Sequence, residues 1–109
     1  MLERDMEELI ARFPEEFFPQ WGLILKGRQQ SFQGVGRYDL LFEDAAHTKV
    51  LMELKATQLK YEEATQVARY KDALETAGHK RILMWLVAPR ILKTVRDYLD
   101  EYGIEYSEI

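Results

Sequence analysis

Three charged residues that can do chemistry together lie within one apolar stretch of this 109-residue chain. Asp39 follows a turn glycine, and Glu53 and Lys55 belong to the triplet Glu-Leu-Lys. Burying an isolated charge costs several kcal/mol, so such groups persist when they are paired or when they hold a metal. Two carboxylates, with waters and a phosphate oxygen completing the shell, describe a magnesium site. A neighbouring lysine can orient the attacking water or stabilise charge that develops on a phosphate.

These residues need strands to position them, and the flanking sequence predicts two. Residues 49–55 read as a strand, whose alternation puts Glu53 and Lys55 on one face, about 6.6 Å apart. Residues 38–42 read as the preceding strand of the same hairpin, and they carry Asp39. Asp39 therefore joins Glu53 if the hairpin register places the two side by side.

The helix predicted for residues 58–77 adds two further candidates. Gln66 and Tyr70 are spaced i and i+4, so they share one side of that helix. Gln66 can hydrogen-bond the lysine, the attacking water or a phosphate, and Tyr70 can contact a nucleic-acid backbone.

The first helix offers one more carboxylate. Apolar residues recur at helical spacing over residues 2–13, and Pro14 marks the predicted end. Glu3 lies beside the apolar face, Glu7 is intermediate and Glu8 points away from it. Glu3 is therefore the candidate that faces inward, although an acid is also favourable simply because it lies at a helix N-terminus.

The remaining elements complete a mixed sheet. We expect a connection over residues 15–20 and strands over 21–25, 81–88 and 104–109, with residues 28–32 extending the first strand or leading to the next. A last helix covers residues 91–102. The order α-β-β-β-α-β-α-β predicts one α/β domain spanning residues 1–109, with helices on both faces of a mixed sheet.

Composition excludes several classes of protein. The chain has no cysteine, which rules out disulfides and Cys-based zinc sites and suits the cytoplasm. No apolar run approaches the roughly 20 residues of a membrane span. Neither a P-loop nor a Ser-His-Asp order occurs, so we expect no organic cofactor.

The net charge of −4 hides an uneven distribution. Residues 55–96 contain nine Lys or Arg and four Asp or Glu, whereas residues 97–109 contain five acids and no base. A local basic patch matters more for phosphate contact than the total charge, although a solvated helix face explains it equally well. The candidate phosphate contacts are Arg28, Lys60 and Arg69.

Three motifs together resemble the PD-(D/E)XK nuclease superfamily, in particular its RecB-like branch and the catalytic domain of NucS-type (EndoMS) endonucleases. Residues 36–39, Gly-Arg-Tyr-Asp, are similar to the Gly-x-x-Asp strand of that superfamily. Residues 53–55 match its D/E-x-K signature, and residues 66–70 match the Gln-x-x-x-Tyr motif of the RecB-like group.

The resemblance implies a restriction-endonuclease-like αβββαβ core and metal-dependent hydrolysis of DNA phosphodiester bonds, of the kind used in repair or restriction. It implies Mg²⁺ or Mn²⁺ bound by Glu3, Asp39 and Glu53, with Lys55 as the catalytic lysine and Gln66 and Tyr70 in support. Because so small a domain covers little DNA, we expect a homodimer with one site for each strand. The alternatives are a nuclease-fold module that binds nucleic acid or protein without cleaving, and a subunit that needs a partner for targeting.

Overall fold

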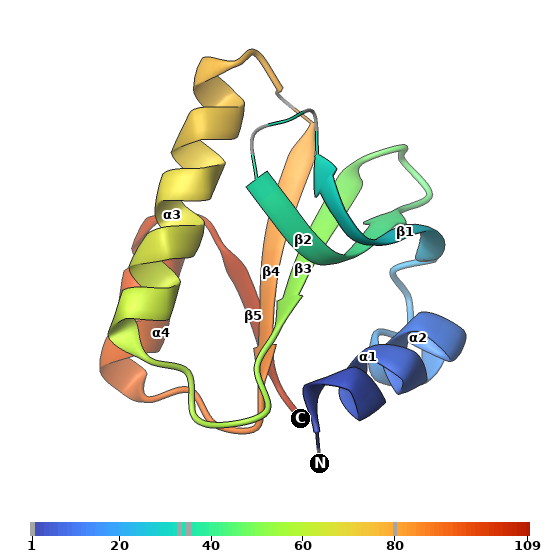
Figure 1. Ribbon diagram of the computed structural model, residues 1–109, viewed down its shortest axis with the longest axis horizontal. Helices are drawn as coiled ribbons and strands as arrows, with labels where there is room; N and C mark the ends of the chain where they lie inside the picture. Colours follow the sequence, from blue (N-terminus) through green and yellow to red (C-terminus); the bar gives the residue numbers. More distant parts are fainter. Residues whose placement is uncertain (1, 33, 35, 80) are drawn as a thin grey trace.

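The computed structural model describes residues 2–32, 34, 36–79 and 81–109, which form four helices and a five-stranded sheet (Figure 1). The elements are α1 (Glu3–Arg12), α2 (Pro14–Phe17), β1 (Ile24–Phe32), β2 (Gly36–Glu43), β3 (Lys49–Leu54), α3 (Tyr61–Thr76), β4 (Ile82–Ala88), α4 (Lys93–Glu101) and β5 (Glu105–Glu108). Within these described ranges, no helix has the length and apolar character needed to cross a membrane.

The strands lie in sequence order, β1-β2-β3-β4-β5, and the sheet is mixed. The β1–β2 and β2–β3 pairs are antiparallel, whereas β3–β4 and β4–β5 are parallel. Helices α3 and α4 make the two crossovers and cover one face, while α1 and α2 lie on the other side (Figure 1). The predicted mixed sheet with helices on both faces is therefore confirmed.

The two faces of β3 pack into two different apolar clusters, as the alternation of its side chains predicts. Leu51 packs with Met84 and Leu86 of β4 beneath α3 and α4. Met52 and its even-numbered neighbours pack instead with Ile10 of α1. Glu53 and Lys55 therefore belong to the face that α3 covers.

Several boundaries differ from those that the sequence predicts. The first strand was expected over residues 21–25, but β1 begins at Ile24 and continues to Phe32, so residues 28–32 extend it. The last helix begins at Lys93 rather than at residue 91.

Residues 15–20 were expected to be a connection, but α2 begins at Pro14, a residue that is favourable at the first position of a helix. Helix α3 begins at Tyr61 rather than at residue 58. Leu59 is buried in the core from an extended segment, and its N–H donates to the Arg90 carbonyl at 2.9 Å.

The β1–β2 ladder shifts its register between Leu25 and Gly27, and it keeps one register beyond Gly27, where it approaches the predicted site. Its paired register passes from Arg28↔Leu40 to Gln30↔Tyr38 and skips Gln29 in the described part of the ladder. Tyr38 packs beneath α3, yet Leu40, two residues later, packs beneath α1. Strict alternation would put both on one face, so β2 rotates between them, at Asp39.

Candidate metal and nucleic-acid site

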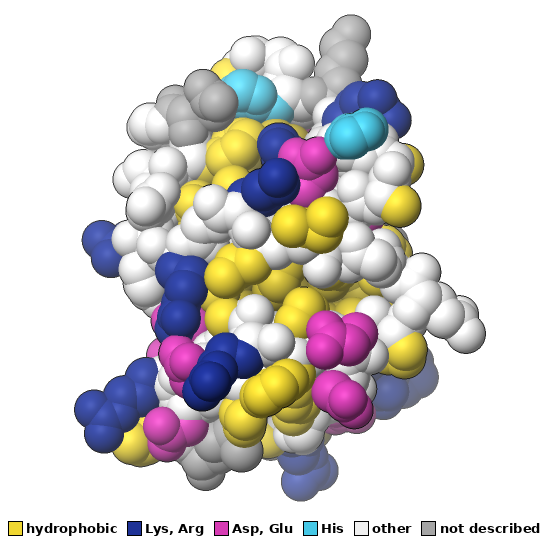
Figure 2. All heavy atoms as spheres, turned by 90° about the vertical axis from the view of Figure 1, so that its right-hand side faces the viewer, with side chains coloured by type: hydrophobic (Ala, Val, Ile, Leu, Met, Phe, Trp, Pro, Cys, Tyr) yellow, Lys and Arg dark blue, Asp and Glu magenta, His cyan; other side chains and the backbone are white. Residues whose placement is uncertain are grey.

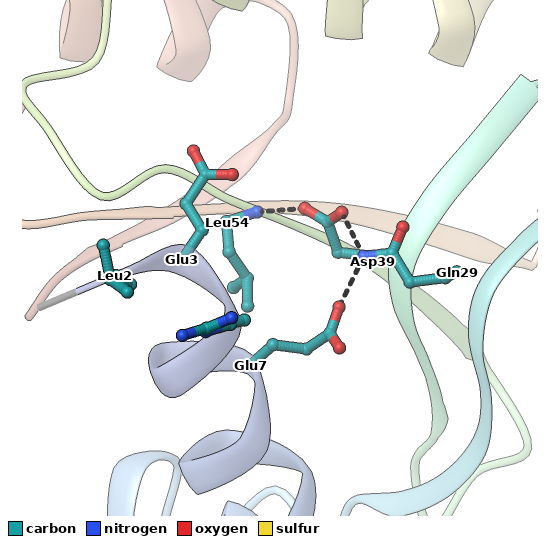
Figure 3. A pocket seen from close by; sticks show the side chains of 7 residues that line it. Leu2, Glu3, Glu7, Gln29, Asp39 and Leu54 are labelled. Carbon is teal, nitrogen blue, oxygen red and sulfur yellow. Dashed lines mark hydrogen bonds between the residues drawn. The ribbon is translucent and has the colours of Figure 1, made fainter.

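Asp39 lies at this rotation and is held by hydrogen bonds from both neighbouring strands (Figure 3). Its Oδ2 accepts the backbone N–H of Leu54 at 2.7 Å, and its Oδ1 accepts Nε2 of Gln29 at 2.9 Å. The β2–β3 register pairs Leu40 with Met52, so Asp39 comes opposite Glu53 at the next step. The structure thus brings together the two carboxylates that the sequence singled out.

Glu53 carries the strongest electrostatic signal of the site. Burial, the charge of Asp39 and a hydrogen bond with Asp39 together raise its pKa to about 8, against the opposing charge of Lys55. Two neighbouring carboxylates share a proton rather than both ionise, unless a cation lies between them. A divalent cation would relieve the repulsion between the two charges, so the Asp39–Glu53 pair can hold one.

Lys55 remains a cation in this environment. Burial lowers its pKa, but the hydrogen bond to Glu63 and the charges of Glu63, Glu3 and Glu53 outweigh that effect, and the pKa lies above its ordinary value. Its Nζ lies 3.2 Å from Oε2 of Glu63, whose Oε1 accepts the backbone N–H of Lys60 at 2.9 Å. Glu63 therefore ties the lysine to the N-terminus of α3, and Lys55 can stabilise negative charge.

Gln66 and Tyr70 line a pocket of about 170 Å³ together with Glu53 and Lys55. The four residues that the sequence motifs singled out on β3 and α3 therefore lie close together. The hydroxyl of Tyr70 donates to the carbonyl of Gly36 at 3.0 Å. A β-carbon at position 36 would lie 2.8 Å from the Tyr70 ring, so this approach requires glycine. Burial, followed by the charge of Glu53, raises the pKa of Tyr70 to about 12, which keeps its hydroxyl protonated.

Helix α1 contributes carboxylates to a second pocket, of about 610 Å³, on the other side of Asp39. Glu3 lines it, and the Oε1 of Glu3 accepts the Ala56 N–H at 3.3 Å. Glu3 is close enough to raise the pKa of Glu53. However, among the described residues no three Asp, Glu, His or Cys side chains converge as a ready group of metal ligands. Of the three predicted ligands, Asp39 and Glu53 therefore form a pair, and Glu3 lies near this pair without completing a group of three.

Two residues of the site were not singled out from the sequence. Glu7 is only 9% exposed and lines the same pocket, where its two oxygens accept from Arg28 and Gln29. The sequence predicted that Glu3 faces inward and placed Glu7 between the faces of α1, and this was wrong: Glu7 is buried, whereas Glu3 is exposed at the rim of the pocket. The spacing of one turn between the two acids was the available signal. Gln29 gave no signal, because its role depends on a backbone conformation that no spacing rule predicts.

The three predicted phosphate contacts have different surroundings. Arg28 forms ion pairs with Glu7 at 2.7 Å and Glu8 at 3.0 Å, so its charge is engaged on α1. Lys60, at the N-cap of α3, and Arg69, within α3, are exposed. Figure 2 shows basic and acidic side chains next to one another on one face of the molecule, rather than one continuous basic surface.

Two further arginines, Arg4 and Arg37, are exposed at the site. Arg4 lines the larger pocket beside Asp39, and Arg37 lines the smaller pocket beside Glu53. One positive charge therefore lies on each side of the carboxylate pair, where a phosphate chain could be contacted from two directions.

Comparison with known proteins agrees with the resemblance to nucleases that the sequence motifs indicate. A family model described as the endonuclease NucS C-terminal domain matches residues 2–109. The endonuclease NucS of Methanopyrus kandleri is 29% identical over 107 residues, which is 98% of this chain and 40% of that relative.

Solved structures agree on the fold. EndoMS in its complex with dsDNA has a TM-score of 0.84 and 26% identity, over 98% of this chain and 44% of that chain. A repair endonuclease from Pyrococcus abyssi has a TM-score of 0.81 and 24% identity, over 100% of this chain and 47% of that chain. The chain thus spans less than half the length of these relatives. It belongs to the NucS C-terminal domain family.

Proposed function

We propose that this chain is a metal-dependent DNA endonuclease domain that hydrolyses phosphodiester bonds, as expected for repair or restriction. The observation that carries the proposal is the half-buried Asp39–Glu53 pair with the protonated Lys55 on the same side of the sheet. Such an arrangement has no value for stability unless a cation completes it. The family membership and the names of the relatives support the same activity.

In this proposal Asp39 and Glu53 hold Mg²⁺ or Mn²⁺, with Glu3 beside them. When bound, the metal would polarise the scissile phosphate and lower the pKa of a bound water. Lys55, fixed by Glu63, stabilises the negative charge that develops on the phosphate. Gln66 lies in the same pocket and hydrogen-bonds a phosphate oxygen.

We further propose that DNA crosses the site between Arg4 and Arg37, with Lys60 and Arg69 contacting phosphates beyond it. Arg28 acts on the DNA only indirectly, because Glu7 and Glu8 hold its guanidinium. A homodimer would supply one site for each strand of a duplex. A cytoplasmic location suits a chain without cysteine.

Two alternatives remain open to experiment. A module that binds without cleaving is favoured by the lack, among the described residues, of a ready group of three metal ligands. A nuclease domain that needs further protein for targeting is favoured by coverage of only 40% of the curated relative.

The test is cleavage of linear, single-stranded, branched and mismatched DNA with Mg²⁺, with Mn²⁺ and with EDTA. We expect metal-dependent cutting that is lost in Glu53→Ala and kept in Glu105→Ala, which removes an exposed glutamate of β5, two strands away from β3. A folded chain that cuts no substrate, but binds DNA, would favour the binding module. A chain that binds Mn²⁺ yet neither cuts nor binds free DNA would favour the partner-dependent subunit.

A further inference from the structure

Two consecutive residues of β1 reach the same carboxylate on α1. Arg28 Nη2 lies 2.7 Å from Oε2 of Glu7, and Gln29 Nε2 lies 2.5 Å from Oε1. Consecutive side chains of a regular strand point to opposite faces, so one of the two residues must depart from strand geometry. Gln29 does so, because its φ is +50°, in the left-handed region that a non-glycine residue rarely adopts.

The same amide also reaches Asp39 (Figure 3). Its Nε2 donates to Asp39 Oδ1 at 2.9 Å as well as to Glu7 Oε1. A side-chain amide has two N–H donors, so these two carboxylates use both of them. With Oδ2 taken by the Leu54 N–H, the carboxylate of Asp39 is fixed on two sides.

The chemical type of this bridge matters for a cation site. An amide donates hydrogen bonds without a formal charge, so it orients Asp39 and leaves the negative charge of that carboxylate available, whereas the charge of Glu7 is already paired with Arg28. Lysine or arginine in place of Gln29 would neutralise Asp39 and would repel a divalent cation. Backbone strain of this kind persists where the surrounding structure requires the conformation, and it concentrates at functional sites.

We propose that Gln29 is a positioning residue for the cation site: its amide sets the orientation of Asp39 and links that carboxylate to Glu7 on α1. The inference rests on the proposed function, since it concerns the affinity of the Asp39–Glu53 pair for a divalent cation. The left-handed backbone of Gln29 is what allows one strand residue to reach both acids.

The test replaces Gln29 in two ways, with Gln20 as a matched control. Gln20 is also a glutamine with a positive φ, +78°, and it is exposed away from the two acids. Gln29→Leu removes both donors at similar size. Gln29→Gly removes them and also relieves the backbone strain, because glycine adopts a positive φ readily. The readouts are calorimetric titration of the metal-free chain with Mn²⁺, the thermal midpoint in EDTA, and cleavage rates over a range of Mn²⁺ concentrations.

We expect both Gln29 variants to bind Mn²⁺ about 10-fold more weakly or worse, the range in which residues that orient metal ligands act. Gln29→Gly should lose affinity without any loss of thermal midpoint, and excess Mn²⁺ should restore its cleavage. Gln20→Leu and Gln20→Gly should bind and cut like the wild type. A purely structural role would instead lower the midpoint and affinity together, and excess Mn²⁺ would not restore cleavage.

The outcomes separate this inference from the proposed function. If the wild type binds Mn²⁺ and cuts DNA, and both Gln29 variants do so equally well, only the role of Gln29 is refuted. If the wild type neither binds Mn²⁺ nor cuts DNA, the proposed function fails and the inference fails with it. If Gln29→Leu does not fold, Gln29→Gly decides the question alone.

Discussion

Replacing Glu53 by glutamine tests the candidate site through stability, without assuming any activity. Glutamine has nearly the shape of the protonated acid but cannot ionise. Burial, reinforced by the charge of Asp39, raises the pKa of Glu53 from 4.5 to about 8. Between these two values the folded chain keeps a proton that the unfolded chain has lost. The resulting stability is complete below the unfolded pKa and disappears as the pH rises through the folded pKa.

The magnitude follows from the size of the shift. In that window each pH unit lowers the free energy of unfolding of the wild type by about 1.4 kcal/mol. From about pH 5.5 to about pH 7.5 the loss attributable to Glu53 is therefore about 3 kcal/mol. Glu53→Gln has no such loss, so we expect it to be more stable than the wild type at the higher pH. It should at the same time be unable to cleave DNA.

The assay is urea unfolding of both proteins in EDTA at several pH values across the window, with Glu105→Gln as the exposed strand control. The difference between Glu53→Gln and the wild type isolates Glu53 from every other titrating group. Mg²⁺ should restore stability to the wild type at the higher pH and leave Glu53→Gln unchanged, because binding to the folded state alone stabilises it. Equal pH dependence in the two proteins would refute the raised pKa of Glu53 and, with it, the inference that the Asp39–Glu53 pair can hold a cation.

Three further predictions concern the residues around this pair. Lys55→Met should lower the single-turnover cleavage rate about 10²–10³-fold while the circular dichroism spectrum stays native, because the charge that stabilises the transition state is lost; an unchanged rate would remove Lys55 from the chemistry. Tyr70→Phe loses the hydrogen bond to the Gly36 carbonyl, so the free energy of unfolding in urea should fall by about 1 kcal/mol; equal stability would show that this bond does not hold β2 to α3. Lys60→Ala should reduce the salt dependence of DNA binding by about one phosphate contact, whereas Arg28→Ala, whose charge Glu7 and Glu8 already engage, should not; the reverse result would exchange their roles.

The parts of the fold that follow from local periodicity could be predicted from the sequence. Alternation along residues 49–55 assigned Glu53 and Lys55 to one face, and the two apolar clusters confirm that assignment. The apolar run of residues 82–88 is typical of a strand that is covered on both faces, and β4 is such a strand. In both cases the pattern repeats over several residues, so one irregular position does not change the result.

The parts that depend on long-range partners could not be predicted. Leu59 fits the apolar stripe of a helix, yet its N–H pairs with Arg90, and the helix begins only after it. Arg28 has the composition of a phosphate contact, but two glutamates on α1 hold it. Gln29 belongs to a strand by propensity and leaves strand geometry because two acids from other elements compete for its amide.

The choice of carboxylate on α1 shows the same dependence most clearly. The facing argument selected Glu3 and left Glu7 between the faces of the helix, but Glu7 is the buried acid and Glu3 is exposed. Their partners separate them: Glu7 accepts from Arg28, 21 residues away, whereas Glu3 accepts from the Ala56 N–H, 53 residues away. Glu7 is therefore coupled to Asp39 through Gln29, and Glu3 is coupled to the end of β3 beside Glu53. Because the two acids act on different members of one pair, α1 positions both sides of the site, and its docking on β1 is part of the site itself.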